Sequence, residues 1–296
     1  MRDADEVVLT SPEGRLEFGM AAAGDLRWVA TDVTGPARFI RRRLDLSPVA
    51  VAALGRCLAG AAMLLRLAQK TPTRLILEVR GDGPLRKVMG EADQEGNLRG
   101  LVGEPRVDVD PYSGGKLAVG RALGSGTLHV LREYERGGRY HSQVRLVSGE
   151  IGQDLAHFLD QSEQVRSAVL VGVLTRPQRV AAAGGLIVEV LPGAREESVR
   201  RLEQNIAASA EVSRTLESGG LAGLEETVLA GLDPQLRQSQ GVRYHCRCSR
   251  ERFLGHLQGL SAEQLEELGL EEEMAIAECA FCGAAYQFQT SELEPQ

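Results

Sequence analysis

The sequence predicts an α+β fold with a mostly antiparallel sheet core and packed helices, a helical linker, and a small C-terminal domain built around four cysteines. Residues 73–147 fall into short runs of alternating apolar and polar positions separated by glycine-rich turns, as antiparallel strands do. Helical spacing of apolar residues occurs in separate segments, which we expect to pack on one side of the sheet. Four of the five cysteines lie after residue 245, where large apolar residues are few.

Changes in pattern along the 296 residues predict three parts. Residues 1–192 contain enough apolar positions for a sizeable α+β core and end at a Pro-Gly pair that follows an apolar strand. We expect a metastable helical linker over residues 193–241. The cysteine domain is expected to cover residues 242–296.

The elements of the core domain are predicted in order from local patterns. Strands are expected at residues 15–18 and 27–33. A helix begins at Ser47, a suitable N-cap followed by proline, and continues to about residue 69. Further strands are expected at residues 73–80, 85–92, 97–103, 116–123, 126–133 and 139–147. A helix over 148–160 and strands at 168–174 and 184–191 complete the core.

Two narrow apolar stripes, within residues 199–210 and 221–232, predict the helices of the linker. Each stripe would bury only a modest area. The linker is therefore either an ordinary helical connection or a segment whose stability depends on docking against its neighbours.

The C-terminal cysteines form a Cys-x-Cys pair, Cys246 and Cys248, and a Cys-x-x-Cys pair, Cys279 and Cys282. Two close pairs separated by thirty residues predict a single four-thiolate zinc site, because two turns can deliver four soft ligands to one tetrahedral ion. Gly283 allows a left-handed turn that directs backbone amides at the sulfurs. A domain of this size also needs a staple, which zinc would supply.

Other interpretations of the cysteines stay open on spacing alone. The alternatives are that the four cysteines are unpaired core residues, that they form structural disulfides, or that they hold zinc without a redox role. His245 and His256 lie nearby but are expected not to be ligands, because four cysteines fill the shell. Cys57, in the helix after Ser47, is interpreted as a small buried hydrophobe rather than a reactive thiol.

The charge distribution argues against nucleic acid as a partner. The net charge is −7, and residues 242–296 contain four arginines against ten glutamates. Binding to a phosphate backbone depends mainly on Lys and Arg. The acidic start of the chain is not that of a secretory signal, and the apolar stretch at 57–65 is too short to span a bilayer. We therefore expect a cytoplasmic protein with no membrane partner.

The motifs together resemble those of the bacterial thirty-three-kilodalton heat-shock protein family, the redox-regulated holdase chaperones. The blocks Cys-Arg-Cys-Ser-Arg-Glu-Arg (246–252) and Cys-Ala-Phe-Cys-Gly (279–283) resemble the zinc centre of that family. The likeness covers nearly the whole chain, and the blocks that carry it are 81–85, 148–155, 161–164, 182–185, 190–194, 246–252 and 279–283.

This resemblance implies a mechanism. The reduced form would hold one zinc per chain through the four cysteines and be inactive, and oxidation would form the disulfides Cys246–Cys248 and Cys279–Cys282 and release the metal. Unfolding would then expose apolar surface for unfolding client proteins, and the oxidised form would be a homodimer. Thioredoxin- or glutaredoxin-type systems would restore the resting state. The resemblance implies a chaperone that does not hydrolyse nucleotides, and no enzyme activity is expected.

Two rival functions follow from the cysteines. A zinc-ribbon nucleic-acid-binding protein would use the arginines beside Cys246 and Cys248, but the many glutamates oppose it. A thiol-disulfide oxidoreductase would have the spacing of Cys279 and Cys282, but that motif usually opens a helix after a strand.

Overall fold

The computed structural model describes residues 11, 13–70, 72–177, 179–209, 211–267 and 274–293. They divide into two compact units, Ser11–Tyr244 and the described part of His245–Gln296.

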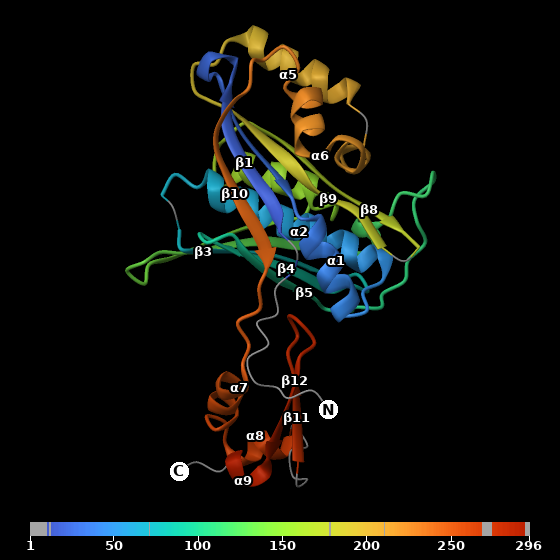
Figure 1. Cartoon of the computed structure of the whole chain (residues 1–296), viewed down its shortest axis with the longest axis vertical. Coiled ribbons are helices and arrows are strands. Elements are labelled where there is room, and N and C mark those ends of the chain that lie inside the picture. The colour runs from blue at the N-terminus through green and yellow to red at the C-terminus, as the bar shows by residue number, and fades with distance from the viewer. Residues whose placement is uncertain are drawn as a thin grey trace. The chain divides into compact units, whose positions relative to one another are not determined.

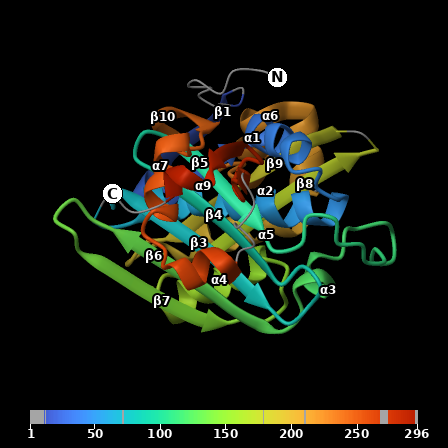
Figure 2. The same ribbon diagram turned by 90° about the horizontal axis from the view of Figure 1, so that it is seen from below.

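The larger unit is built on one ten-stranded sheet with the order β7-β6-β3-β4-β5-β10-β1-β2-β9-β8. Its strands are β1 (Gly14–Ala21), β2 (Leu26–Asp32), β3 (Arg74–Gly81), β4 (Lys87–Asp93), β5 (Asn97–Val102), β6 (Gly126–Glu133), β7 (Arg139–Arg145), β8 (Ser167–Arg176), β9 (Arg179–Val190) and β10 (Gln235–Tyr244). Figure 2 shows β7, β6, β3, β4 and β5 in this order. The predicted mostly antiparallel α+β core is thereby confirmed.

Two antiparallel halves of this sheet meet at a single parallel pairing. Strand β10 pairs with β1 along most of its length, but with β5 only at Arg243 opposite Asn97 and Tyr244 opposite Leu98. The strands therefore separate on the N-terminal side of Arg243, at the place where the sheet changes from one half to the other.

The helices of the larger unit include a long apolar one at its centre. They are the 3-10 turn η1 (Ala22–Gly24), α1 (Thr34–Arg43), α2 (Pro48–Leu67), α3 (Val119–Leu123), α4 (Gly152–Gln161), α5 (Glu196–Ala208) and α6 (Val212–Val228). Helix α2 begins as predicted, because the Ser47 side chain accepts a hydrogen bond from the amide of Ala50. Its length and composition would suit a membrane span, but 94% of its apolar window is buried, as in a core helix.

Helices cover both faces of the β2–β9 region, so the expectation that they lie on one side is wrong (Figure 1). Helices α2 and α6 both contact β9. Successive side chains of a strand point to opposite faces, so β9 can pack against a helix on each face. Residues 180–189 of β9 are buried without a break. A continuous apolar strand is typical of a sheet covered on both faces, so the apolar run of β9 is the feature of the sequence that indicates helices on both faces.

The elements at residues 119–123 and 34–43 differ from the prediction. Residues 119–123 form the short helix α3 instead of a strand, and its Gly120 amide donates to the Glu150 carboxylate. Helix α1 was not predicted, because a Gly-Pro pair such as Gly35-Pro36 is typical of turns. Pro36 lies in the first helical turn, where the missing N–H removes no helical hydrogen bond.

The segment expected to be a helical linker contains two helices followed by a strand. The apolar faces of α5 and α6 pack on the sheet in one cluster with Trp28, Leu186 and Val188. Residues 235–244 form the strand β10 and not a continuation of the predicted helical linker. Helix α5 is also held by side chains to the turn that precedes β2, since Arg195 and Ser198 both bond to Asp25.

The smaller unit contains short elements around a small apolar core. They are α7 (Arg250–Leu257), α8 (Ala262–Glu267), β11 (Met274–Glu278), β12 (Ala285–Gln289) and α9 (Thr290–Leu293). Among the described residues of this unit, the buried apolar side chains apart from cysteines are those of Ala275, Phe288 and Leu293. A capping box begins α8, since Ser261 and Gln264 exchange hydrogen bonds between backbone amides and side chains.

Candidate metal centre

The structure brings the four C-terminal cysteines together. Cys246 and Cys248 lie between β10 and α7, and Cys279 and Cys282 lie in the turn between β11 and β12. All four Sγ atoms are within 4.8 Å of one another. The sulfurs of Cys246 and Cys279 are 3.7 Å apart, and those of Cys248 and Cys282 are 3.4 Å apart.

The β11–β12 turn is shaped to present two sulfurs on one side. The amides of Cys282 and Gly283 both donate to the carbonyl of Cys279, and the Cys279 amide donates to the carbonyl of Ala284. Gly283 has φ +64°, the left-handed conformation expected for it. Backbone amides of Phe281 and Cys282 also face the Cys279 sulfur, where they favour its thiolate form.

These spacings fit a tetrahedral metal ion. Sulfurs held about 2.3 Å from a central zinc stand about 3.8 Å apart. The observed sulfur distances of 3.4 and 3.7 Å are close to this value, and no side chain needs a large movement to reach it. Three of the cysteines are buried and Cys248 is partly exposed. A burial of this kind excludes most water from the sulfurs.

Hydrogen bonds among the thiols distribute the protons unequally. Bonds from the thiols of Cys246 and Cys282 lower the pKa of Cys279 to about 2. The bond between Cys246 and Cys279 raises the pKa of the Cys246 thiol to about 12. The pKa of Cys282 is also raised, by its bonds to Cys246 and Cys279 and by burial. The cluster thus favours one thiolate, and a bound cation would favour release of the other protons.

A tyrosine completes the surroundings of the sulfurs. The Tyr286 hydroxyl donates to Cys248 Sγ over 3.2 Å, and burial followed by this bond raises the pKa of Tyr286. Such a donor orients a ligand and stabilises its charge. Sequence reasoning gave Tyr286 no role. Its position four residues after Cys282, on the strand leaving the turn, was the signal for it.

An ion pair holds the start of helix α7, which follows the first cysteine pair. Arg250 Nη2 lies 2.8 and 2.7 Å from the two Glu292 carboxylate oxygens, and the Arg250 guanidinium lies 4.8 Å from the Phe288 ring centroid. Ser249 caps α7, and its side chain accepts a hydrogen bond from the Arg252 amide. Arg250 is therefore engaged within the unit, which reduces the basic face that a nucleic-acid partner would need.

Cys57, His245 and His256 are not part of the cysteine cluster. In the described chain, the group of residues able to share one metal ion consists of the four C-terminal cysteines alone. Cys57 is fully buried in α2 and donates to the Leu77 carbonyl, and burial raises the pKa of its thiol. The interpretation of Cys57 as a small buried residue is confirmed.

Comparison with known proteins identifies the family. The model of a family described as Hsp33 protein matches residues 15–289. This chain belongs to the Hsp33 family. A relative from Thermus thermophilus named 33 kDa chaperonin is 43% identical over 291 residues, covering 95% of this chain and 85% of the relative. A relative of the same name from Symbiobacterium thermophilum is 42% identical over 276 residues, covering 93% of this chain and 94% of the relative.

A solved structure has the same fold. The 33 kDa chaperonin of Thermotoga maritima, an Hsp33 homologue, matches with a TM-score of 0.86 at 31% identity, over 94% of this chain and 96% of that one. The family expected from the sequence motifs is therefore confirmed. The nucleic-acid alternative is not favoured, because Hsp33 relatives carry the name of a chaperone.

Proposed function

We propose that this protein is a redox-regulated, ATP-independent holdase chaperone that is inactive when reduced and metal-bound and is activated by oxidation. The observation that supports this most is the set of four cysteine sulfurs at tetrahedral spacing in a unit with little other core. Membership of the Hsp33 family points in the same direction.

One zinc ion per chain would be held by Cys246, Cys248, Cys279 and Cys282. Zinc bound to four thiolates supplies folding free energy, on the order of 10–16 kcal/mol in small domains. The three buried apolar side chains that the structure describes in this unit, those of Ala275, Phe288 and Leu293, are too few to replace that contribution. The folded state of the cysteine unit therefore depends on its sulfurs remaining reduced.

Oxidation would convert the four thiols into two disulfides. A cysteine thiolate attacks one oxygen of hydrogen peroxide, forming a sulfenic acid and releasing water once a proton is taken up. A second thiol displaces water from that sulfenic acid and forms the disulfide. Each disulfide thus removes two electrons and two protons from two thiols and reduces one peroxide to two waters. Disulfide sulfurs are poor metal ligands, so the site would no longer retain zinc.

The proposed disulfides are Cys246–Cys248 and Cys279–Cys282, which join neighbours in sequence. The shortest sulfur contacts of the reduced cluster instead cross between the pairs. All four sulfurs lie within 4.8 Å, so distance alone does not select the pairing. We propose the sequence neighbours because they stay close when the unit unfolds.

Unfolding of the cysteine unit would destabilise the linker, because the two segments follow each other directly in the chain. Strand β10 ends at Tyr244, two residues before Cys246. We divide the chain functionally into the core of residues 1–192, a metastable linker of residues 193–241 and the redox domain of residues 242–296. Release of α5 and α6 would expose the apolar faces that now pack on the sheet. Those faces are suited to unfolding client proteins.

The remaining features follow the same proposal. The oxidised form would be a homodimer, thioredoxin- or glutaredoxin-type reductants would reverse the switch, and the protein would act in the cytoplasm without membrane or nucleic-acid partners. It would prevent aggregation without catalysing a reaction on its clients.

The test compares reduced, oxidised and re-reduced protein in one aggregation assay. A thermally unfolding client is followed by light scattering, with no nucleotide present. We expect suppression from protein treated with hypochlorite, or with peroxide under mild heat, and none from the reduced or re-reduced samples. Equal suppression by reduced and oxidised protein would overturn the proposal.

A further inference from the structure

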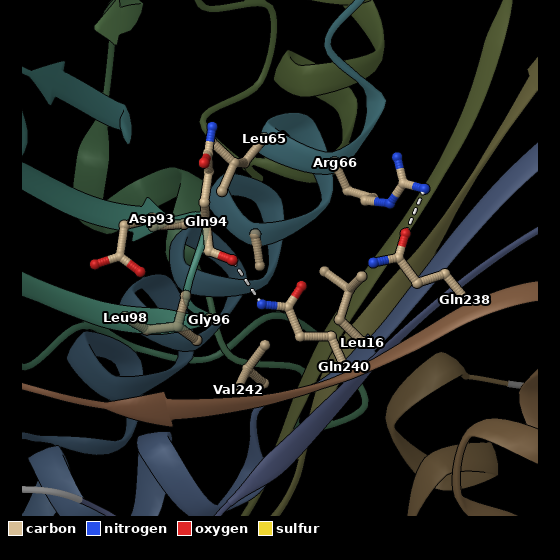
Figure 3. Close-up of a pocket in the computed structure, with 12 residues that line it drawn as sticks. Leu16, Leu65, Arg66, Asp93, Gln94, Gly96, Leu98, Gln238, Gln240 and Val242 are labelled. Atoms are coloured by element: carbon tan, nitrogen blue, oxygen red, sulfur yellow. Dashed lines mark hydrogen bonds between the residues drawn. The ribbon is translucent and has the colours of Figure 1, made fainter. Parts of the chain in front are cut away.

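A hollow of about 390 Å³ lies in the larger unit where β10 separates from β5 (Figure 3). Its walls come from four elements far apart in sequence: β1, the C-terminal end of α2, the β4–β5 hairpin and β10. A volume of this size is within the range of small-molecule sites, which are commonly 300–1,000 Å³. None of its lining residues belongs to the cysteine unit.

One part of the hollow is apolar. Its apolar lining residues are Leu16, Ala62, Leu65, Ala92, Leu98 and Val242. All six are buried, so the surface they present is fixed by the packing of the sheet against α2. Such a lining favours an aliphatic group over a polar one, because burial of apolar area is favourable and burial of unpaired polar groups is costly.

The polar part is dominated by Arg66. Its guanidinium carbon lies 3.8 Å from the Phe18 ring centroid, and its Nη2 donates to Gln238 Oε1 over 2.8 Å. Its Nε is buried and has no hydrogen-bond partner. Within the residues that the structure describes, no carboxylate forms an ion pair with Arg66. Burial, followed by the nearby charge of Arg27, lowers the pKa of Arg66, as expected for a cation without a counter-ion.

Asp93 is the carboxylate among the described residues that line the hollow, and it is already engaged. Asp93 accepts hydrogen bonds from the amides of Glu95 and Asn97 and from the Asn97 side chain, all within the β4–β5 hairpin. The Gln240 side chain donates to the Gln94 carbonyl over 2.8 Å (Figure 3). The bond with Arg66 uses the side-chain oxygen of Gln238, so its NH2 group remains available to a ligand. The unmatched groups are thus donors beside an apolar wall.

We propose that this hollow binds a small monocarboxylate with an aliphatic chain, its carboxylate on the Arg66 guanidinium and its chain along the wall formed by Leu16, Leu65 and Leu98. The carboxylate supplies the acceptor that Arg66 Nε lacks and the negative charge that this side of the hollow lacks. The site lies within the larger unit, but Gln238 and Gln240 belong to the linker of the proposed switch, so the test uses the reduced protein.

A bound ligand would join β10 to the rest of the sheet where pairing is weakest. Gln238 and Val242 are in β10, whereas Arg66 is in α2 and Leu98 is in β5. Beyond this hollow, β10 reaches β5 through two residue pairs only. We therefore expect backbone amides of β10 to exchange hydrogen more slowly when the ligand is bound.

The test uses reduced, metal-loaded, full-length protein and sodium octanoate as the probe, in isothermal titration calorimetry below the micelle concentration. We expect one saturable site per chain, with n-octanol binding at least roughly tenfold more weakly because it lacks the charge. Hydrogen exchange of β10 in the same protein should slow with octanoate and not with octanol.

Two variants locate the site. Arg66→Met should weaken octanoate binding roughly tenfold or more, whereas Arg106→Met, which removes the same charge from an exposed ion pair, should not change it. Ala62→Leu, which fills the hollow, should also abolish binding and serves if Arg66→Met does not fold by circular dichroism. The proposal is overturned by absent or unsaturable binding, by equal binding of octanoate and octanol, or by folded variants that bind like the wild type.

Discussion

The hydroxyl of Tyr244 makes two hydrogen bonds with Gly100, donating to its carbonyl over 2.9 Å and accepting from its amide over 3.2 Å. Tyr244 is fully buried, and its ring lies 5.5 Å from that of Phe39. The strand it ends, β10, pairs with β5 over two residues only. Tyr244 therefore anchors the C-terminal end of β10 in the sheet, and the cysteine unit begins at the next residue.

Replacing Tyr244 with phenylalanine tests this anchor. The aromatic ring stays, but the Gly100 amide and carbonyl lose a buried partner, so the free energy of unfolding of the larger unit should fall by about 1–3 kcal/mol. Urea denaturation measures the change. Tyr140→Phe is the control, because Tyr140 is 53% exposed and should lose nothing measurable. Equal stability of the two variants would mean that the bonds to Gly100 do not hold the strand.

Docking of α6 on the sheet is tested at Leu224, which is buried in the cluster with Trp28. Leu224→Ala should destabilise the native state by roughly 2–5 kcal/mol through the cavity it leaves. Because the proposed function requires release of α6, this variant should also suppress client aggregation at a lower oxidant dose. Leu236→Ala, at a side chain 55% exposed, should change stability by about 0.5 kcal/mol or less. An unchanged oxidant dose for Leu224→Ala would contradict the role of α6.

The alternation of apolar residues was enough to predict most strands and the long helix α2, since these patterns are local. It was insufficient for β10. Residues 235–240 are mostly exposed, with polar side chains on both faces, so the strand has no apolar alternation to reveal it. Its place in the sheet comes from backbone pairing with β1, which depends on residues more than two hundred positions away. The same holds for α1, whose proline was compatible with a turn or a first helical turn.

A carboxyl pair between α6 and β1 predicts a pH dependence. Burial, followed by contact with Glu17, raises the pKa of Glu225 from 4.5 to about 8. Between these values the folded state keeps a proton that the unfolded chain has released. The stabilisation linked to this proton is full below pH 4.5 and is lost as the pH rises toward 8.

Glu225→Gln should remove this pH dependence. The variant should be more stable than the wild type at pH 8 by about 1 kcal/mol, a value reduced from the full shift because solvent screens a half-buried carboxyl. Denaturation at several pH values measures it, with Glu226→Gln as the exposed control. A wild-type stability that stays level from pH 5 to pH 8 would show that the pair does not share a proton.

Metal binding is tested by replacing cysteines. Cys279→Ser with Cys282→Ser should lose zinc and the oxidation-dependent change in activity, because a hydroxyl is a much weaker zinc ligand than a thiolate. Cys57→Ala should keep one zinc per chain, since Cys57 is buried in α2 away from the cluster. Metal content by mass spectrometry compares them. Full zinc in the double variant would reject the assignment of these ligands.

Spacing was sufficient to predict that the four cysteines meet, because close pairs in two turns can reach one point. It was insufficient for the groups around them. Tyr286 reaches Cys248 only because β12 continues from the turn in register with β11. Arg250 binds Glu292, a residue of α9 distant in sequence. The hollow beside Arg66 joins four separate elements, and no local pattern indicates it.

The central claim is that loss of the metal and gain of chaperone activity are one event. The most direct measurement treats reduced, zinc-loaded protein with hypochlorite and follows released zinc with a chromogenic chelator, while aliquots from the same sample are added to a thermally aggregating client. We predict that one zinc per chain is released with the same time course as the gain in suppression, and that reductant with added zinc reverses both. Zinc that stays bound while activity rises, or leaves without any gain in suppression, would contradict the account.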